Sequence, residues 1–372
     1  MGNSITVLSG TLVTLTGTES DANSDLNTNT RLWTIESGPS SPAITNPTSL
    51  NASVTPNSIG AYTVKLSESD SLGLNGSDTV TVTSKFGLTL FGGHTGTVPL
   101  SDTWEWNGTN WAQKSPVNFP QTRYSYSMAY DSTRSKIVIF GGNNNTGVIS
   151  HTLEWNGTNW SQISPGNFPQ ARQEHSMAYD SVRGKTVLFG GFTTDVVSDT
   201  WEWDGTNWTQ RSPVNFPQAR KRHTMAYSSA GTKTVLFGGR TNTVLLSDTW
   251  EWNGTNWAQK SPVNFPQARE FHAIAYDNVR DKIVLFGGSN GTSWLSDTWE
   301  WDGTNWTQKS PVASPTAREG HSMAYDSVRG KTVLFGVSSN NAISDTWEWD
   351  GTNWTNKNPT TSPQARFWHS LA

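Results

Sequence analysis

The chain has 372 residues, a formal charge of −4 and no cysteine. The missing cysteines exclude disulfides, thiolate metal sites and cysteine nucleophiles. Beyond residue 85 the acidic and basic residues are equal in number, which excludes the basic surface typical of proteins that bind nucleic acid or an anionic membrane. No run of about 18 apolar residues predicts membrane insertion. The abundant Thr, Asn, Ser, Gly and Trp are typical of secreted β proteins, so we expect an extracellular or cell-surface location, with a leader that this chain does not include.

Residues 1–84 contain short apolar-polar alternations, such as Val13 with Leu15 and Val64 with Leu66, separated by turn residues. This pattern predicts a β-sandwich with one buried face on each sheet. The expected strands are Ile5 to Leu8, Leu12 to Thr16, Arg31 to Glu36, Ala52 to Thr55, Ala61 to Leu66 and Thr79 to Thr83. The segments Leu32-Trp33-Thr34, Gly60-Ala61-Tyr62-Thr63-Val64 and Asp78-Thr79-Val80-Thr81-Val82 resemble PKD-like, immunoglobulin-like domains of bacterial surface proteins. The resemblance implies a spacer or stalk.

Six near-copies of one segment follow, and Asp199 to Gln210 is an example. The position of its first tryptophan recurs at Trp104, Leu153, Trp201, Trp250, Trp299 and Trp347, which gives a period of 48 or 49 residues. A period of this length indicates a repeat architecture. Trp-Glu-Trp alternates with period two before Asn-Gly or Asp-Gly, so each copy predicts a β-hairpin with a two-residue type I′ turn.

Each repeat also contains two further apolar strands, and the second of them ends in Gly-Gly after Phe91, Phe140, Phe189, Phe237 and Phe286. A histidine at the head of the first strand, the Gly-Gly end and the tryptophan hairpin together resemble the kelch motif. The resemblance implies an all-β fold in which residues 86–372 form a six-bladed β-propeller. Because Arg366 to Ala372 matches a first strand and Leu88 to Phe91 a second one, we expect the C-terminal strand to close the ring.

Residues that repeat in every copy favour structural roles. The hairpin tryptophans are expected to fill the space between sheets. A ring of His175, His223, His272, His321 and His369, with Tyr126 in the sixth place, is expected to form hydrogen bonds and not to bind metal, because counterpart atoms of neighbouring blades lie too far apart. We expect the repeated arginines, such as Arg220, to pair with the repeated glutamates, such as Glu202, since a buried charge needs a partner. Acid-base catalysis would instead require one blade to differ.

Positions at which the copies differ are the candidates for binding. The pairs that follow each repeated arginine share no residue type, and in kelch domains that bind peptides the matching positions line the channel mouth. The candidate ligand-binding residues are Tyr124, Glu174, Arg222, Phe271, Trp294 and Trp368. A second variable set joins the second and third strands, for example Arg240 to Leu246 and Val337 to Ile343, and should open on the same face. Relaxed constraint in exposed loops would also give variation.

The sequence therefore predicts a noncatalytic binding or adhesion protein whose propeller face takes a protein or glycan ligand. No cofactor, metal or catalytic residue is expected, since the sequence has no phosphate-binding glycine loop, nucleophile elbow or zinc motif. One alternative is a self-assembling subunit of a surface filament, surface layer or virion appendage. A kelch-type carbohydrate-active enzyme is another alternative, although the cysteine-crosslinked tyrosine of galactose oxidase is impossible here.

Overall fold

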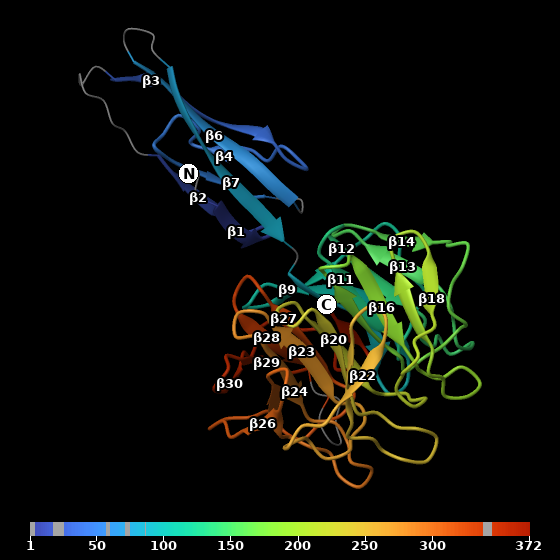
Figure 1. The fold of residues 1–372 in the computed structure, drawn as a ribbon. Coiled ribbons are helices and arrows are strands. Elements are labelled where there is room, and N and C mark those ends of the chain that lie inside the picture. The colour runs from blue at the N-terminus through green and yellow to red at the C-terminus, as the bar shows by residue number, and fades with distance from the viewer. Residues whose placement is uncertain (1–3, 18–25, 57–59, 71–74, 86, 338–343) are drawn as a thin grey trace. The chain divides into compact units, whose positions relative to one another are not determined.

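The computed structural model describes residues 4–17, 26–56, 60–70, 75–85, 87–337 and 344–372. The chain divides into two compact units, Met1–Gly87 and Leu88–Ala372, and every regular element of the described residues is a β-strand (Figure 1). Those residues include no helix that is long and apolar enough to cross a membrane. The all-β class expected from the sequence is confirmed.

The first unit consists of two sheets with one core between them. One sheet has the order β1-β7-β6-β3 and the other β2-β5-β4. The core contains Val13, Leu15, Trp33, Val64 and Val82, which are the inward members of the alternating patterns. The strands are β1 (Ser4–Leu8), β2 (Val13–Thr16), β3 (Leu26–Ser37), β4 (Ile44–Thr45), β5 (Asn51–Val54), β6 (Gly60–Asp70) and β7 (Asn75–Lys85). Only the two-residue β4 was missed by the sequence pattern.

The second unit is built from repeated four-stranded antiparallel sheets, coloured in chain order from teal to red in Figure 1. The described residues form six of them. The first three are β31 (Ser370–Leu371) with β8 (Leu88–His94), β9 (Pro99–Trp106) and β10 (Trp111–Lys114); β11 (Ser127–Asp131), β12 (Lys136–Phe140), β13 (Thr152–Trp155) and β14 (Trp160–Ile163); and β15 (Ser176–Asp180), β16 (Lys185–Phe189), β17 (Thr200–Trp203) and β18 (Trp208–Arg211).

The other three sheets follow the same order. They are β19 (Thr224–Ser228), β20 (Lys233–Phe237), β21 (Thr249–Trp252) and β22 (Trp257–Lys260); β23 (Ala273–Asp277), β24 (Lys282–Phe286), β25 (Thr298–Trp301) and β26 (Trp306–Lys309); and β27 (Ser322–Asp326), β28 (Lys331–Phe335), β29 (Thr346–Trp349) and β30 (Trp354–Asn356). The C-terminal strand β31 pairs with β8, with Ser370 opposite Phe91 and Leu371 opposite Leu90. This is the pairing expected from the sequence.

The repeated tryptophans lie between neighbouring sheets, as expected. Trp257 is buried against Phe189 of the preceding sheet, and its indole N–H donates to Thr200 Oγ1 of that sheet at 2.9 Å. The same bond recurs from Trp111 to Thr346, Trp160 to Thr103, Trp208 to Thr152, Trp306 to Thr249 and Trp354 to Thr298. Each of these six tryptophans therefore buries its ring while its one polar atom keeps a partner.

The hairpin connection differs from the predicted type I′ turn. Trp203 pairs with Trp208, so four residues and not two connect β17 to β18. The Asp204 carboxylate accepts the backbone N–H groups of Thr206 and Asn207 at 2.8 and 2.9 Å, and only Gly205 takes a positive φ, of 98°. The two-residue prediction was wrong because the side chain of the first loop residue, Asp or Asn, takes over the capping.

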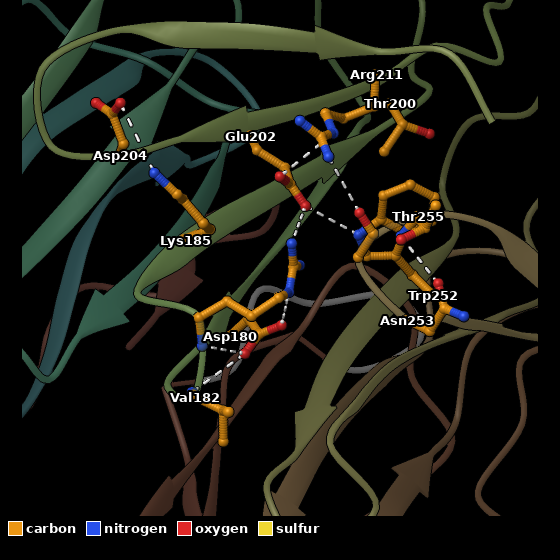
Figure 2. A network of polar contacts seen from close by, with 12 residues as sticks. Asp180, Val182, Lys185, Thr200, Glu202, Asp204, Arg211, Trp252, Asn253 and Thr255 are labelled. Atoms are coloured by element: carbon orange, nitrogen blue, oxygen red, sulfur yellow. Dashed lines mark hydrogen bonds and ion pairs between the residues drawn. The ribbon is translucent and has the colours of Figure 1, made fainter.

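The expected pairing of repeated arginines with repeated glutamates is also wrong. Arg172 binds Asp199 through two hydrogen bonds of 2.6 and 2.7 Å. Glu202 instead pairs with Arg183 from the turn between β15 and β16. Figure 2 shows Glu202 between Asp180 of the same sheet and Trp252 of the next. Asp199 directly precedes β17 and Glu202 is the third residue of that strand, so Arg172, which precedes β15, and Arg183, from the β15–β16 turn, reach different carboxylates. The other Arg–Asp pairs are Arg220–Asp248, Arg269–Asp297, Arg318–Asp345 and Arg366–Asp102.

Candidate binding site

The second residue of each variable pair lies in one ring of backbone hydrogen bonds. Each member donates its N–H to the carbonyl of its counterpart in the preceding sheet over 2.8–3.2 Å, and Ser125 donates to Trp368, so the series is continuous. All six backbones have φ between 55° and 69°. Non-glycine residues rarely take this conformation, and here the hydrogen bonds offset its cost. The members are Ser125, Glu174, Arg222, Phe271, Gly320 and Trp368.

These six residues line a cavity of about 110 Å³, which we call the central cavity. Its deeper wall is formed by Tyr126, His175, His223, His272, His321 and His369. Strands begin just after these residues, so a variable ring stands above a repeated one. The arrangement separates side chains that can differ between sheets from side chains that hold the sheets together.

One side of the central cavity is aromatic. The ring of Trp368 stacks on Tyr124 at a centroid distance of 5.8 Å and on Phe271 at 6.1 Å. Phe367 meets Trp368 edge to face at 4.6 Å, and His94 lies 5.0 Å from Tyr124. Tyr124, Phe271 and Trp368 are half-buried, so part of each ring is open to a ligand.

The other side is charged. The Arg222 guanidinium lies 4.3 Å above the Phe271 ring and 3.0 Å from both Glu174 and Glu270. Arg240 reaches Glu270 at 3.2 Å, and Lys221 reaches Glu174 at 3.3 Å. Burial alone would lower the pKa of Arg222, but the two glutamates raise it above its ordinary value. The cations and carboxylates are therefore held as fixed charges that present a defined pattern to a ligand.

The deeper histidines are neutral. Burial, followed by the adjacent repeated arginine, lowers the pKa of His175, His272 and His369 to about 3. His175 packs edge to face against Phe140 at 5.8 Å, and His223 against Phe189 at 5.6 Å. In the sixth place, the Tyr126 hydroxyl donates to the carbonyl of Phe91. No three His, Asp or Glu side chains within the described ranges lie together as a metal site.

Four of the six candidate residues line the central cavity. These are Glu174, Arg222, Phe271 and Trp368. Tyr124 lies beside the cavity, stacked on Trp368. Trp294 is 38% exposed and does not line it, although its side chain bonds Glu319, whose pKa burial raises.

Sequence reasoning missed Glu270 and Arg240, which complete the ion pairs around Arg222. Glu270 is the first residue of the variable pair Glu270-Phe271, and its position in that pair could have identified it as a candidate binding residue. Such first-place residues bridge to the loop after Gly-Gly, as Tyr124 does to Asn143 and Lys221 to Arg240. The two variable sets therefore adjoin. Residues 338–343 of the last loop lie outside the described residues.

Comparison with protein families matches the repeats and the first unit separately. The KLHDC2/KLHL20/DRC7 Kelch-repeats domain matches residues 135–262 and 204–372. A PKD-domain family matches residues 1–83. A search of curated proteins found no match. The kelch matches cover more than half of the chain, and they agree with the repeated four-stranded sheets and their Gly-Gly ends. The chain therefore belongs to the kelch-repeat family and carries a PKD domain at its N-terminal end.

Proposed function

We propose that this protein is a noncatalytic, extracellular or cell-surface binding protein whose kelch unit takes a protein or glycan ligand at the central cavity. The PKD domain serves as a spacer. The observation that carries the proposal is the placement of Trp368 between Tyr124 and Phe271, beside the charge cluster of Arg222. Half-buried aromatic rings next to fixed charges are typical of binding hot spots.

We further propose that the six sheets are the blades of one propeller closed by β31. Support comes from two series that each run through all six sheets, the backbone ring at the central cavity and the Trp–Thr bonds, and from the pairing of the C-terminal strand β31 with β8. A closed ring leaves no sheet without neighbours on both faces. It also fixes the spacing of the six variable residues around the cavity.

The charge cluster favours binding over catalysis. Glu174 and Glu270 are both committed to ion pairs with Arg222, and each has a second cation within 3.3 Å. A general acid or base needs a pKa near the working pH and access to the substrate proton. Two carboxylates held by four ion-pair contacts are better suited to orienting Arg222 toward a carboxylate, a carbonyl or a sugar hydroxyl.

The test is binding of the intact chain to glycan and protein arrays. Substituting Arg222, Phe271 and Trp368 with alanine should abolish the binding that the parent shows. Phe216→Ala is the control, since Phe216 is an exposed aromatic residue of the repeated connection and does not line the central cavity. An array signal that survives the triple substitution would show that the ligand site lies elsewhere.

Self-assembly is a second candidate, and a repeated apolar surface favours it. The connection between sheets exposes a valine in four repeats, and Val312 is 97% exposed. The other three are Val117, Val214 and Val263. Exposed apolar residues at a regular spacing suit a contact between copies of the chain. Light scattering should then show oligomers that dissociate when the four valines are replaced by serine, while an unchanged monomer mass in the parent rejects this candidate.

A further inference from the structure

Four sheets hold an arginine in the same way at the turn between their first and second strands. Arg183 donates from Nε to Asp180 Oδ2 and from Nη1 to Glu202 Oε1, both at 2.6 Å. Trp252 of the next sheet donates its indole N–H to the same glutamate oxygen at 3.0 Å (Figure 2). We call this space between two sheets the guanidinium slot. Its other occupants are Arg134, Arg280 and Arg329.

The β19–β22 sheet lacks the arginine and its aspartate. Where the preceding copy has Asp180-Ser181-Val182-Arg183, this copy has Ser228-Ser229-Ala230-Gly231. A cavity of about 250 Å³ lies at this place, between the β19–β22 and β23–β26 sheets. Its volume greatly exceeds the roughly 30 Å³ that one water molecule occupies in the liquid. We call it the Glu251 cavity; its walls include Ser228, Gly231, Glu251, Trp301 and Gly303.

The hairpin glycines give an independent measure of the free space. A methyl group added at Gly254 would lie 2.8 Å from Nε of Arg183, because the guanidinium covers that glycine. The same close approach occurs at Gly108, Gly205 and Gly351. At Gly303, the counterpart beside the Glu251 cavity, nothing lies within 4 Å. Gly303 is exposed whereas Gly254 is buried, so the cavity opens to the surface at the place where a guanidinium lies in the other slots.

The acceptor of the slot is retained. Glu251 is the counterpart of Glu202, and its Oε2 pairs with Lys260 at 3.3 Å, as Glu202 Oε2 pairs with Arg211. Within the described part of the chain, no ion pair reaches Glu251 Oε1, the oxygen that holds the arginine in the other slots. Asp281 from the next sheet also lines the cavity and accepts the Tyr276 hydroxyl at 2.9 Å. Two carboxylates therefore flank the space.

The buried tryptophan beside the cavity has lost its bond. Trp252, Trp349 and Trp106 donate to the glutamate of a filled slot, but the Trp301 indole N–H has no partner among the described residues. The Trp203 indole N–H also has no partner among the described residues, although Arg134 fills its slot. An unpaired buried N–H is costly. A ligand that draws the Glu251 carboxylate toward Trp301 would restore the indole hydrogen bond and would also add its own bonds to the carboxylate.

We propose that the Glu251 cavity binds a guanidinium group supplied by another molecule, either a free guanidinium compound or an arginine side chain of a partner protein. A planar guanidinium offers five donors to the carboxylates of Glu251 and Asp281, which both line the cavity, whereas an ammonium is a point charge. Lys233 lines the same cavity, and its counterpart Lys136 shares Glu154 with Arg134, so this lysine is compatible with a bound guanidinium.

The test is calorimetric titration of the full chain with methylguanidinium, with methylammonium as the matched cation, at millimolar concentrations well below those that denature. The parent should bind methylguanidinium at one site and methylammonium at least about tenfold more weakly, since the bridging charge-assisted bonds are lost. Equal affinity for the two cations, or no heat with either, would overturn the proposal.

Two variants locate the site. In S228D/G231R the chain supplies its own arginine; Gly231 has no positive φ and its added Cβ meets only the Ser228 side chain, so this variant should fold and bind nothing. E251Q should bind methylguanidinium at least about tenfold more weakly than the parent. Unchanged binding in S228D/G231R would refute the assigned cavity. The last probe is a short peptide that contains one arginine. If it binds more tightly than methylguanidinium, the source is an arginine of a partner protein, and equal binding identifies a free compound.

Discussion

The buried histidine ring should make the kelch unit sensitive to mild acid. The native pKa of His175, His272 and His369 is about 3, against an ordinary value of 6.5. Between these values the unfolded chain binds a proton that the folded chain does not, so the free energy of unfolding falls as pH falls below 6.5. pH 5 lies about 1.5 units below the ordinary histidine pKa, and each unit lowers the free energy of unfolding by roughly 1.4 kcal/mol per histidine. Each histidine therefore costs about 2 kcal/mol of stability at pH 5.

The three histidines together therefore cost about 6 kcal/mol between pH 7 and pH 5, a large share of the roughly 5–15 kcal/mol that stabilises a typical domain. His223 and His321 act in the same direction, because burial also lowers their pKa. Four of the Arg-paired aspartates, Asp102, Asp199, Asp248 and Asp297, do not contribute in this window. The pKa of Asp199, for example, is lowered from 3.8, so its stabilisation is lost only at more acidic pH.

The assay is urea unfolding followed by tryptophan fluorescence at pH 7, 6 and 5, since 19 of the 20 tryptophans lie in the kelch unit. His175→Tyr is the matched variant, because Tyr126 already occupies the equivalent place in another sheet. It should reduce the slope of unfolding free energy against pH by about 1.4 kcal/mol per unit. A free energy that stays level from pH 7 to pH 5 would refute the buried, neutral state of the ring.

Three further predictions concern stability. Arg123 is buried, has no carboxylate within ion-pair distance among the described residues, and has a pKa that burial lowers to about 10. His151 stands where Asp199 serves Arg172, so His151→Asp should raise stability by about 2 kcal/mol, and a melting temperature that does not rise contradicts this pairing. Gly205→Ala should destabilise the protein more than Gly303→Ala. The two glycines have similar φ angles, 98° and 91°, but only Gly205 faces a guanidinium, so equal losses of melting temperature would mean that backbone strain alone decides. Deleting residues 365–372 removes β31 and the Arg366–Asp102 pair, so the protein should aggregate or melt well below the parent, whereas deleting residues 1–84 should leave the kelch unit folded. A monomeric truncation with unaltered melting would place ring closure elsewhere.

Periodicity predicted the architecture because every repeat must solve the same packing problem. The spacing of Trp201 and its counterparts, the Gly-Gly ends and the match of the C-terminal residues to a first strand were sufficient to predict the sheets and the pairing of β31 with β8. The ion pairs could not be predicted in the same way. Arg172, Asp199 and Glu202 all repeat with the same period, and only the register of β17 shows which carboxylate each arginine reaches.

The candidate site was predicted as a set of positions but not as a geometry. Variation after each repeated arginine indicated Glu174, Arg222, Phe271 and Trp368. Their shared φ near 57° could not be predicted from the residue types. The loss of an arginine at Gly231 was visible in the sequence. Its consequence required knowing that the arginine of one sheet lies against the hairpin of the next.

Hydrogen exchange of the ligand-bound chain tests the central claim most directly. With the protein or glycan found on the arrays, protection should appear in the backbone segments that contain Tyr124, Glu174, Arg222, Phe271 and Trp368. The hairpin loops, which lie at the other end of the strands, should exchange as in the free protein. Protection confined to those loops or to residues 1–84, with the five segments unchanged, would contradict the assignment of the central cavity as the binding site.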